Sequence, residues 1–142
     1  MAKQISVFLE NKAGRLSNVT RVLGDAGINI RALSIADTSD FGILRIIVSD
    51  PVKAYKILKE AGFTVSETQV IAVRVPDSPG GLADILEQMA EENLNIEYLY
   101  AFLGSTEQDA LVIFKVEDVE KAEMVFKKKE IKFIDENQLY SM

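Results

Sequence analysis

The sequence contains no cysteine, histidine or tryptophan among its 142 residues. Without cysteine there is no disulfide framework and no thiol nucleophile. Without histidine as well, the chain lacks the most common general base at neutral pH and the most common zinc ligands. These absences exclude large classes of enzymes and zinc proteins, so we expect no metal site and no cofactor.

Long apolar runs are also missing. No run approaches the roughly 20 residues that a membrane helix needs, and Met1-Ala2-Lys3-Gln4 begins an alternating pattern without a signal-peptide core. The net charge of -6 argues against sequence-independent nucleic-acid binding, which needs clustered cations. With 48% hydrophobic and 27% charged residues, the composition is typical of a folded globular protein. We expect a cytoplasmic protein that binds neither nucleic acid nor membrane.

The sequence repeats itself, and a turn, a helix, a strand and a second helix recur in the same order. A two-residue insertion near Ser105 separates two parts of the alignment. The aligned segments are 11–16 with 77–82 and 27–30 with 93–96 at a shift of 66, and 50–58 with 118–126 at a shift of 68.

Hydrophobic periodicity predicts the type of each element. Asp50 followed by Pro51 is a typical helix start, with Asp as the N-cap and Pro at the first helical position. The polar segment 37–40 predicts a hairpin turn. The first copy is predicted to contain strands 5–9, 28–36, 41–48 and 63–67 with helices 16–26 and 51–61; the second, strands 70–75, 94–103, 110–116 and 131–134 with helices 82–89 and 119–126.

Each copy therefore reads β-α-β-β-α-β. A right-handed strand-helix-strand crossover leaves room between its two parallel strands, and the hairpin partner fills that gap. The expected fold class is α+β, with two tandem ferredoxin-like units, residues 1–68 and 69–142. Each unit would be a four-stranded antiparallel sheet with helices on one face. Because such small units have thin cores, we expect the units to pack together and the chain to form a homodimer.

The most informative motif is the turn after the first strand of each copy. In the second copy, residues 76–82 join an apolar strand directly to an amphipathic helix. Glycine permits positive φ, and the helix N-terminus beyond it presents N–H groups that suit a carboxylate. Asn29 and Asn95 begin the next strand at the far end of the first helix, so either could meet such a turn only from another unit. The alternative interpretation is a simple turn, in which Asn or Asp is only a cap.

These residues resemble the ACT domain, an amino-acid-sensing module. The resemblance lies in residues 6–16 with Gly27-Ile28-Asn29-Ile30, and in residues 77–82 with Asn95-Ile96. The second copy is similar to the family's Asp-x-Pro-Gly-x-Leu turn, whereas the first has Asn11 for Asp and Ala13 for Pro. Residues 6–16 are also similar to the regulatory subunit of acetolactate synthase.

The resemblance implies a non-catalytic regulator that binds a small-molecule ligand, an amino acid, at the interface between ACT units and signals allosterically to a partner enzyme. Glycine-turn amides would hold the ligand carboxylate, and Asp77 or an Asn side chain would accept from its ammonium. The implied ligand residues are Asn11, Ala13, Gly14, Arg15 and Leu16 in one loop, Asp77, Pro79, Gly80, Gly81 and Leu82 in the other, and Asn29, Ile30, Asn95 and Ile96 on the facing strands.

Two other functions stay open at this point. The first is a regulatory or structural subunit of an amino-acid biosynthetic enzyme, which dimerises or docks without binding a ligand itself. The second is a small carboxylate-based enzyme, because the ferredoxin-like fold hosts many functions. No pair of acidic residues is placed together in a predicted cleft, which disfavours the enzyme.

Overall fold

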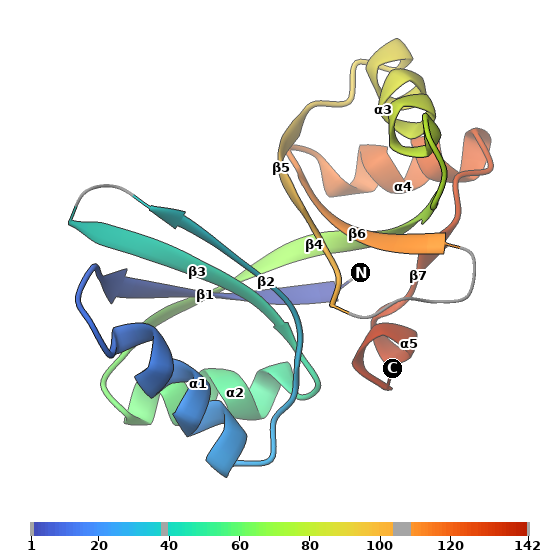
Figure 1. The fold of residues 1–142 in the computed structure, drawn as a ribbon. Coiled ribbons are helices and arrows are strands. Elements are labelled where there is room, and N and C mark those ends of the chain that lie inside the picture. Colours follow the sequence, from blue (N-terminus) through green and yellow to red (C-terminus); the bar gives the residue numbers. More distant parts are fainter. Residues whose placement is uncertain (1, 38–39, 104–108, 142) are drawn as a thin grey trace. The chain divides into compact units, whose positions relative to one another are not determined.

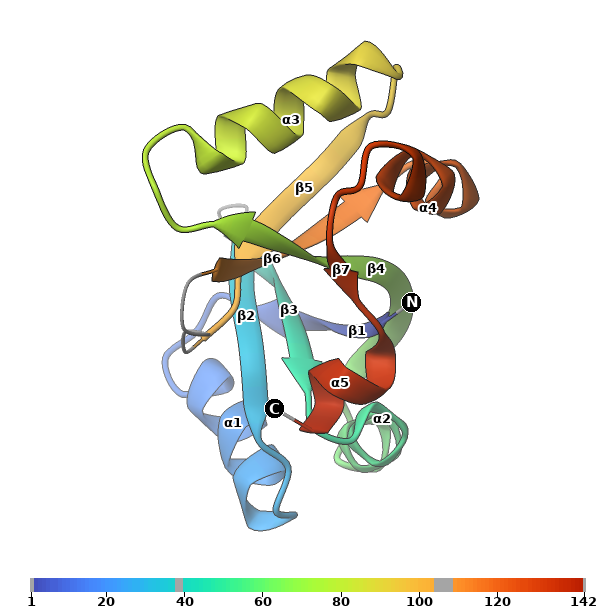
Figure 2. The ribbon, with the colours of Figure 1, turned by 90° about the vertical axis from the view of Figure 1, so that its right-hand side faces the viewer.

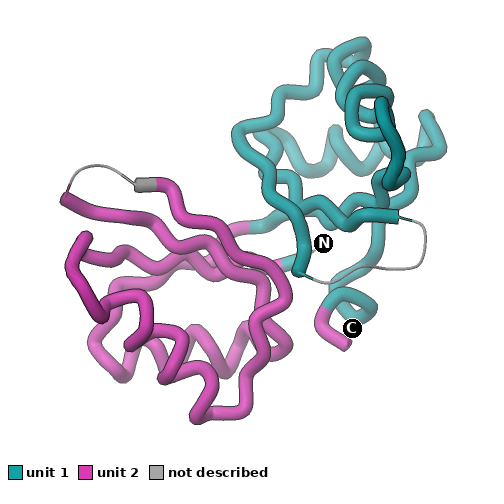
Figure 3. The backbone as a smooth tube through the Cα atoms, viewed as in Figure 1, with its two compact units in different colours: residues 1–2, 69–139 teal, residues 3–68, 140–142 magenta. Residues whose placement is uncertain are grey.

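The computed structural model describes residues 2–37, 40–103 and 109–141 (Figure 1). They form two compact units. The N-terminal module comprises residues 3–68 with 140–142, and the C-terminal module comprises residues 69–139 with 1–2 (Figure 3, magenta and teal). The elements are β1 (Ala2–Glu10), α1 (Arg15–Asp25), β2 (Ile30–Asp37), β3 (Phe41–Val48), α2 (Pro51–Glu60), β4 (Thr64–Pro76), α3 (Gly81–Glu91), β5 (Ile96–Ala101), β6 (Asp109–Val116), α4 (Val119–Lys128), β7 (Phe133–Ile134) and α5 (Glu136–Ser141).

The N-terminal module has the strand order β2-β3-β1-β4, to which β4 contributes its first half. β1 and β3 are antiparallel, with Ile5 opposite Ile46 and Glu10 opposite Phe41. Both helices cover one face of this sheet (Figure 2). Val19 and Leu23 of α1 and Leu58 of α2 are fully buried against it. The amphipathic pattern of each helix therefore produces one core between sheet and helices.

The C-terminal module repeats this arrangement with the strand order β7-β4-β6-β5. Pro76 at the end of β4 lies opposite Asp109 at the start of β6. Its core surrounds the fully buried rings of Phe114 and Phe126, and Met89 of α3 packs into the same cluster. The two modules are thus two tandem ferredoxin-like units of α+β class, as the periodicity predicted.

Three details differ from the sequence prediction. β4 is one continuous strand, whereas two strands separated at Thr68-Gln69 were expected. No Gly or Pro stands at that point, and neighbouring Thr and Val residues favour an extended backbone. β5 and β7 are shorter than expected, at six and two residues. The division into ACT domains 1–68 and 69–142 remains a prediction.

The short helix α5 was not predicted at all. The Asp135 side chain accepts a hydrogen bond from the Gln138 backbone N–H at 2.9 Å. The Gln138 side chain accepts from the Asp135 backbone N–H at 3.4 Å. This reciprocal pair is a capping box, which is a sequence signal for a helix start. Among the described residues, no helix is long and apolar enough to cross a membrane.

Candidate functional site

The turn between strand and helix has the same backbone in both modules. Gly14, before α1, has φ 87°, and Gly80, before α3, has φ 86°, so both lie in the left-handed region that favours glycine. In the first turn, the Lys12 N–H donates to the Glu10 carbonyl at 2.8 Å. In the second, the Ser78 N–H donates to the Pro76 carbonyl at 2.9 Å. The first turn has Ala13 where the second has Pro79, and the two turns nevertheless have the same backbone geometry.

Neither turn places a side chain over the first amides of its helix. No side-chain hydrogen bond caps α1 or α3 among the described residues. In contrast, the Asp50 and Asp118 side chains accept from the first turns of α2 and α4, each at 3.1 Å. An α-helix leaves its first amide groups without intrahelical acceptors, and the dipole there favours an anion. The two glycine turns thus leave their helix N-termini without a side-chain cap, while the other two helices are closed by aspartate. The first N–H of each helix, that of Arg15 or Gly81, donates to the turn carbonyl of Lys12 or Ser78 at 3.3 or 3.0 Å, so the amides that follow are the ones available to a ligand.

A cavity of about 250 Å³ lies beside the turn of the N-terminal module. We name it the turn cavity. Asn11, Arg15 and Leu16 of the predicted ligand loop line it, and β2 and β3 contribute Ile35 and Gly42 to its lining. Its remaining lining residues are Leu9, Glu10 and Lys12.

Charge in the turn cavity is organised around Glu10. Its carboxylate lies 2.9 Å from the Lys12 Nζ and 3.5 Å from the Arg15 guanidinium. The hydrogen bond and charge of Lys12, followed by the charge of Arg15, hold the pKa of Glu10 below its usual value. Glu10 is therefore an ionised acceptor at neutral pH, with two cations next to it.

The turn cavity combines three kinds of contact. Arg15 and the amides at the start of α1 can donate to a carboxylate. Glu10 and the Asn11 side chain can accept from an ammonium group. Leu16 and Ile35 are exposed apolar side chains, with 39% and 47% of their surface accessible. This arrangement suits a small zwitterion with an aliphatic side chain.

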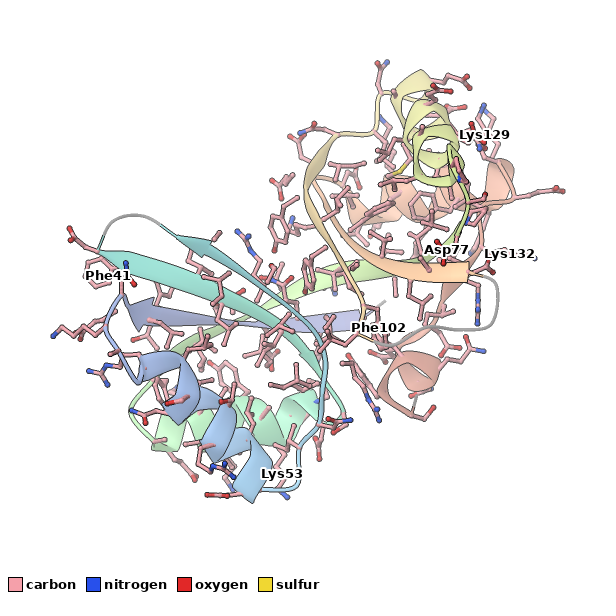
Figure 4. The ribbon with its side chains drawn as sticks, in the orientation of Figure 1. Phe41, Lys53, Asp77, Phe102, Lys129 and Lys132 are labelled. Atoms are coloured by element: carbon pink, nitrogen blue, oxygen red, sulfur yellow. The ribbon has the colours of Figure 1, made fainter. Side chains whose placement is uncertain are left out.

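A second cavity of about 210 Å³ shares Glu10 and Arg15 with the turn cavity. We name it the aromatic cavity. The rings of Phe8, Phe41 and Phe63 line it, and Phe8 and Phe41 are half exposed. Phe41 lies at the end of the sheet beside the first turn (Figure 4). Large apolar side chains that stay exposed in a group indicate a surface available for binding.

A third cavity, of about 320 Å³, lies in the C-terminal module. We name it the charged cavity. Pro76 and Gly81 of the second turn border it, and Figure 4 shows where Lys129 and Lys132 lie in this module. Its charged lining residues are Arg74, Asp84, Asp109, Lys129, Glu130 and Lys132.

The remaining residues of the predicted ligand site are either exposed in the turns or buried against the cores. Ala13, Asp77 and Pro79 are exposed in the two turns. Gly81 is buried, and an added Cβ there would lie 2.1 Å from the Pro76 carbonyl oxygen, so the turn requires glycine at this position. Three of the predicted residues, Leu82, Ile30 and Ile96, pack against the hydrophobic cores.

The two predicted asparagines lie at the other end of their modules. The Asn29 N–H donates to the Ser49 hydroxyl at 3.0 Å, next to the start of α2. Asn95 lines a fourth cavity of about 730 Å³ beside the start of α4. The 11 residues of α1 span about 16 Å between Gly14 and this end. Within the N-terminal module, the structure therefore does not bring Asn29 to the glycine turn.

The prediction missed Glu10, Ile35 and the exposed phenylalanines. Phe8 and Glu10 occupy the outward positions of an alternating strand, where a large apolar residue such as Phe8 is unexpected; this was an available signal. Ile35 reaches the site only through the pairing of β2 with β3, which the sequence does not reveal. The described residues contain no group of three or more metal-ligating side chains.

Two βαββαβ modules, each with a glycine turn before its first helix, are the arrangement expected of a pair of ACT domains. The family model of the ACT domain pair matches residues 1–142, and the chain belongs to this family. No curated protein matches the sequence.

Solved structures agree with this family. Protein BT0572 from Bacteroides thetaiotaomicron is 44% identical, with a TM-score of 0.93 and coverage of 99% of this chain and 96% of that one. The regulatory subunit of aspartate kinase from Thermus thermophilus, in its ligand-free form, is 17% identical, with a TM-score of 0.67 and coverage of 88% and 87%. The structure of the aspartokinase alpha and beta subunits is 21% identical in sequence and has a TM-score of 0.58. The match covers 89% of this chain and 87% of that one. The last two likenesses show the fold.

Proposed function

We propose that this protein is a non-catalytic regulator that binds an aliphatic amino acid in the turn cavity and passes the binding event to a partner enzyme. The observation that supports the proposal is the composition of that cavity. The start of α1, which has no side-chain cap, and Arg15 can donate to a carboxylate, and the Glu10 carboxylate lies beside Arg15. Leu16 and Ile35 are the apolar part of the lining. Each part of a leucine, isoleucine or valine molecule finds its complement there.

Calorimetric titration with the common amino acids tests this proposal. We expect an aliphatic amino acid to bind, and Arg15→Gln to weaken it about tenfold or more, because a charge-assisted hydrogen bond to the carboxylate is lost. Arg21→Gln is the matched control. Arg21 also lies on α1 in an exposed ion pair, 3.7 Å from Asp25, but it does not line the cavity. Absence of binding by every amino acid at millimolar concentration would contradict the proposal.

Exposed apolar side chains next to the site favour an association surface as well. Phe8, Leu16, Ile35 and Phe41 are all at least 39% exposed. Phe8 and Phe41 line the aromatic cavity, and Leu16 and Ile35 line the turn cavity. Because exposed apolar surface commonly marks a protein interface, we propose that a second copy of the chain covers these side chains and closes the turn cavity. Light scattering tests this: Ile35→Ser with Phe41→Ser should turn a dimer into a monomer without loss of helical content. A monomeric wild-type chain would exclude the homodimer.

The same surface gives a second candidate function, a subunit that docks onto an enzyme without binding an amino acid. The four exposed apolar side chains would then contact the enzyme instead of a second copy. Two results together would favour this alternative. The wild-type protein would bind no amino acid, and the double variant Ile35→Ser with Phe41→Ser would no longer bind the partner enzyme. Wild-type protein that binds leucine would exclude it.

A further inference from the structure

The charged cavity occupies the position in the C-terminal module that the aromatic cavity occupies in the N-terminal module. Strand register agrees with the alignment given by the sequence repeat. Glu10 lies opposite Phe41 in the first sheet, and Pro76 lies opposite Asp109 in the second. The equivalent lining residues are Phe8 and Arg74, Glu10 and Pro76, Phe41 and Asp109, Gly62 and Glu130, and Thr64 and Lys132.

Charged and neutral positions are exchanged between the two cavities. In the N-terminal module, the charges stand at the turn, in Glu10 and Arg15, and the strand position Phe8 is apolar. In the C-terminal module, the turn positions are neutral, Pro76 and Gly81, and the strand position carries Arg74. The two equivalent cavities therefore carry their charges at different positions, and the charged cavity has its own chemistry.

Two cations face each other in the charged cavity. Val73 is paired with Phe133, which places the next residue, Arg74, opposite Lys132. The Arg74 backbone N–H donates to the Lys132 carbonyl at 2.8 Å, and both residues line the cavity. Like charges directly opposite each other on paired strands repel, and an anion that binds between them removes this repulsion.

Acidic groups complete the charged cavity. The carboxylates of Asp84, on α3, and Glu130, after α4, are exposed and line it together with Asp109. They can accept hydrogen bonds from an ammonium group. The remaining cation, Lys129, already lies 2.9 Å from the Glu91 carboxylate. The cavity thus offers a pair of cations for an anionic group and separate carboxylates for a cationic one.

We infer that the charged cavity is a second ligand site, which binds an acidic amino acid, aspartate or glutamate. The two carboxylates of the ligand each contact one of the two cations, Arg74 and Lys132, and the ammonium faces Asp84 and Glu130. The inference builds on the proposed function, since it extends amino-acid binding to the C-terminal module. One chain then responds to two amino acids of different chemical class.

Separate titrations of the full chain with L-glutamate, L-aspartate and L-leucine test the inference. We expect an acidic amino acid to bind, and Arg74→Gln and Lys132→Gln each to weaken it about tenfold or more. Leucine binding should stay within about twofold in both variants, because the turn cavity is unchanged. Arg15→Gln should have the reverse effect. Neither Arg74→Gln nor Lys132→Gln should lower the melting temperature, because each removes a repulsion between like charges.

Lys127→Gln is the matched control, because Lys127 is an exposed lysine of α4 that does not line the cavity. Equal weakening by Lys127→Gln and Lys132→Gln would show only an effect of net charge and would overturn the inference. Leucine binding without binding of aspartate or glutamate would also overturn it, while the proposed function stands. Binding of glutamate without leucine would support the charged cavity and contradict the aliphatic site. Failure of all three amino acids to bind would overturn both.

Discussion

Lys53 donates a hydrogen bond from its Nζ to the backbone carbonyl of Ala26 at 2.9 Å. Lys53 lies in the first turn of α2, and Ala26 is the C-cap of α1. The last carbonyl groups of a helix have no intrahelical donor, and the negative end of the helix dipole lies there. A lysine of one helix therefore caps the end of the other.

A similar contact occurs in the C-terminal module, where the Lys121 Nζ donates at 3.1 Å to the carbonyl of Asn93, the residue after the α3 C-cap Glu92. In both modules, the backbone N–H of this lysine also donates to the aspartate N-cap of its own helix. The Asp-x-x-Lys sequence thus closes one helix start and one helix end in each module.

Lys53→Met should lower the free energy of unfolding by about 0.5–1.5 kcal/mol, because the α1 carbonyl loses a charged donor while the apolar stem is kept. Urea denaturation measures this change. Lys56→Met is the control: Lys56 is exposed on the same helix, so its effect should stay within about 0.5 kcal/mol. Equal losses for the two variants would show that the Lys53 bond contributes nothing specific.

Gly81→Ala should lower the free energy of unfolding by about 2–4 kcal/mol. The added Cβ would lie 2.1 Å from the Pro76 carbonyl oxygen, so the backbone of the second turn must move. Gly24→Ala is the opposite case, because Gly24 lies in α1 with nothing within 4 Å of an added Cβ. It should raise the free energy of unfolding by about 0.5–1 kcal/mol. Thermal and urea unfolding compare the two, and a tolerated Gly81→Ala would contradict the turn geometry.

Glu130→Gly should raise the free energy of unfolding by about 0.5–1 kcal/mol. Glu130 has φ 57°, a left-handed conformation that is strained for glutamate, and Gly62 occupies the equivalent position in the N-terminal module with φ 93°. Asn93, with φ 55°, is the control. Asparagine tolerates this conformation, so Asn93→Gly should change stability by less than about 0.5 kcal/mol. A larger gain at Asn93 than at Glu130 would contradict this explanation.

The sequence was sufficient to predict the element order and both glycine turns, because these depend on local signals. Periodicity identified every strand of the two sheets, and Gly14 and Gly80 have the positive φ that the turn motif required. The helix α5 was missed, although Asp135 and Gln138 have the spacing of a capping box. This signal is local, so the sequence alone is sufficient to predict the helix start.

The walls of the cavities could not be predicted in the same way. Ile35 and Gly42 reach the turn cavity from the β2–β3 hairpin, so their position depends on strand register. Arg74 and Lys132 are 58 positions apart in sequence and meet because β7 pairs with β4. Periodicity places a residue on one face of a strand, but it does not determine which residue lies opposite. The chemistry of a cavity depends on those pairs.

The acid dependence of leucine binding should report the ionisation of Glu10. Lys12, through its hydrogen bond and its charge, and then Arg15 hold the pKa of Glu10 below its usual value. Protonation removes the acceptor of the ligand ammonium, so affinity should be constant from neutral pH into the acid range. It should then fall with a midpoint below the ordinary glutamate value of about 4.3. Calorimetry over a pH series measures the midpoint of the fall in leucine affinity, and an NMR titration of the Glu10 carboxyl group measures its pKa.

The free energy of unfolding should also fall as the pH is lowered and Glu10 is protonated. Because the pKa of Glu10 is lower in the folded chain than in the unfolded chain, its ion pairs stabilise the fold above the unfolded-state pKa, and this contribution is lost as pH falls through the folded-state pKa. Lys12→Gln should move the NMR midpoint of Glu10 upward more than Arg15→Gln does, since Lys12 has the larger effect. High salt should reduce both shifts, because these groups are exposed. If the Glu10 midpoint were at or above the ordinary glutamate value, the two cations would not lower the pKa of this carboxylate, and the expected acid shift of leucine binding would be contradicted.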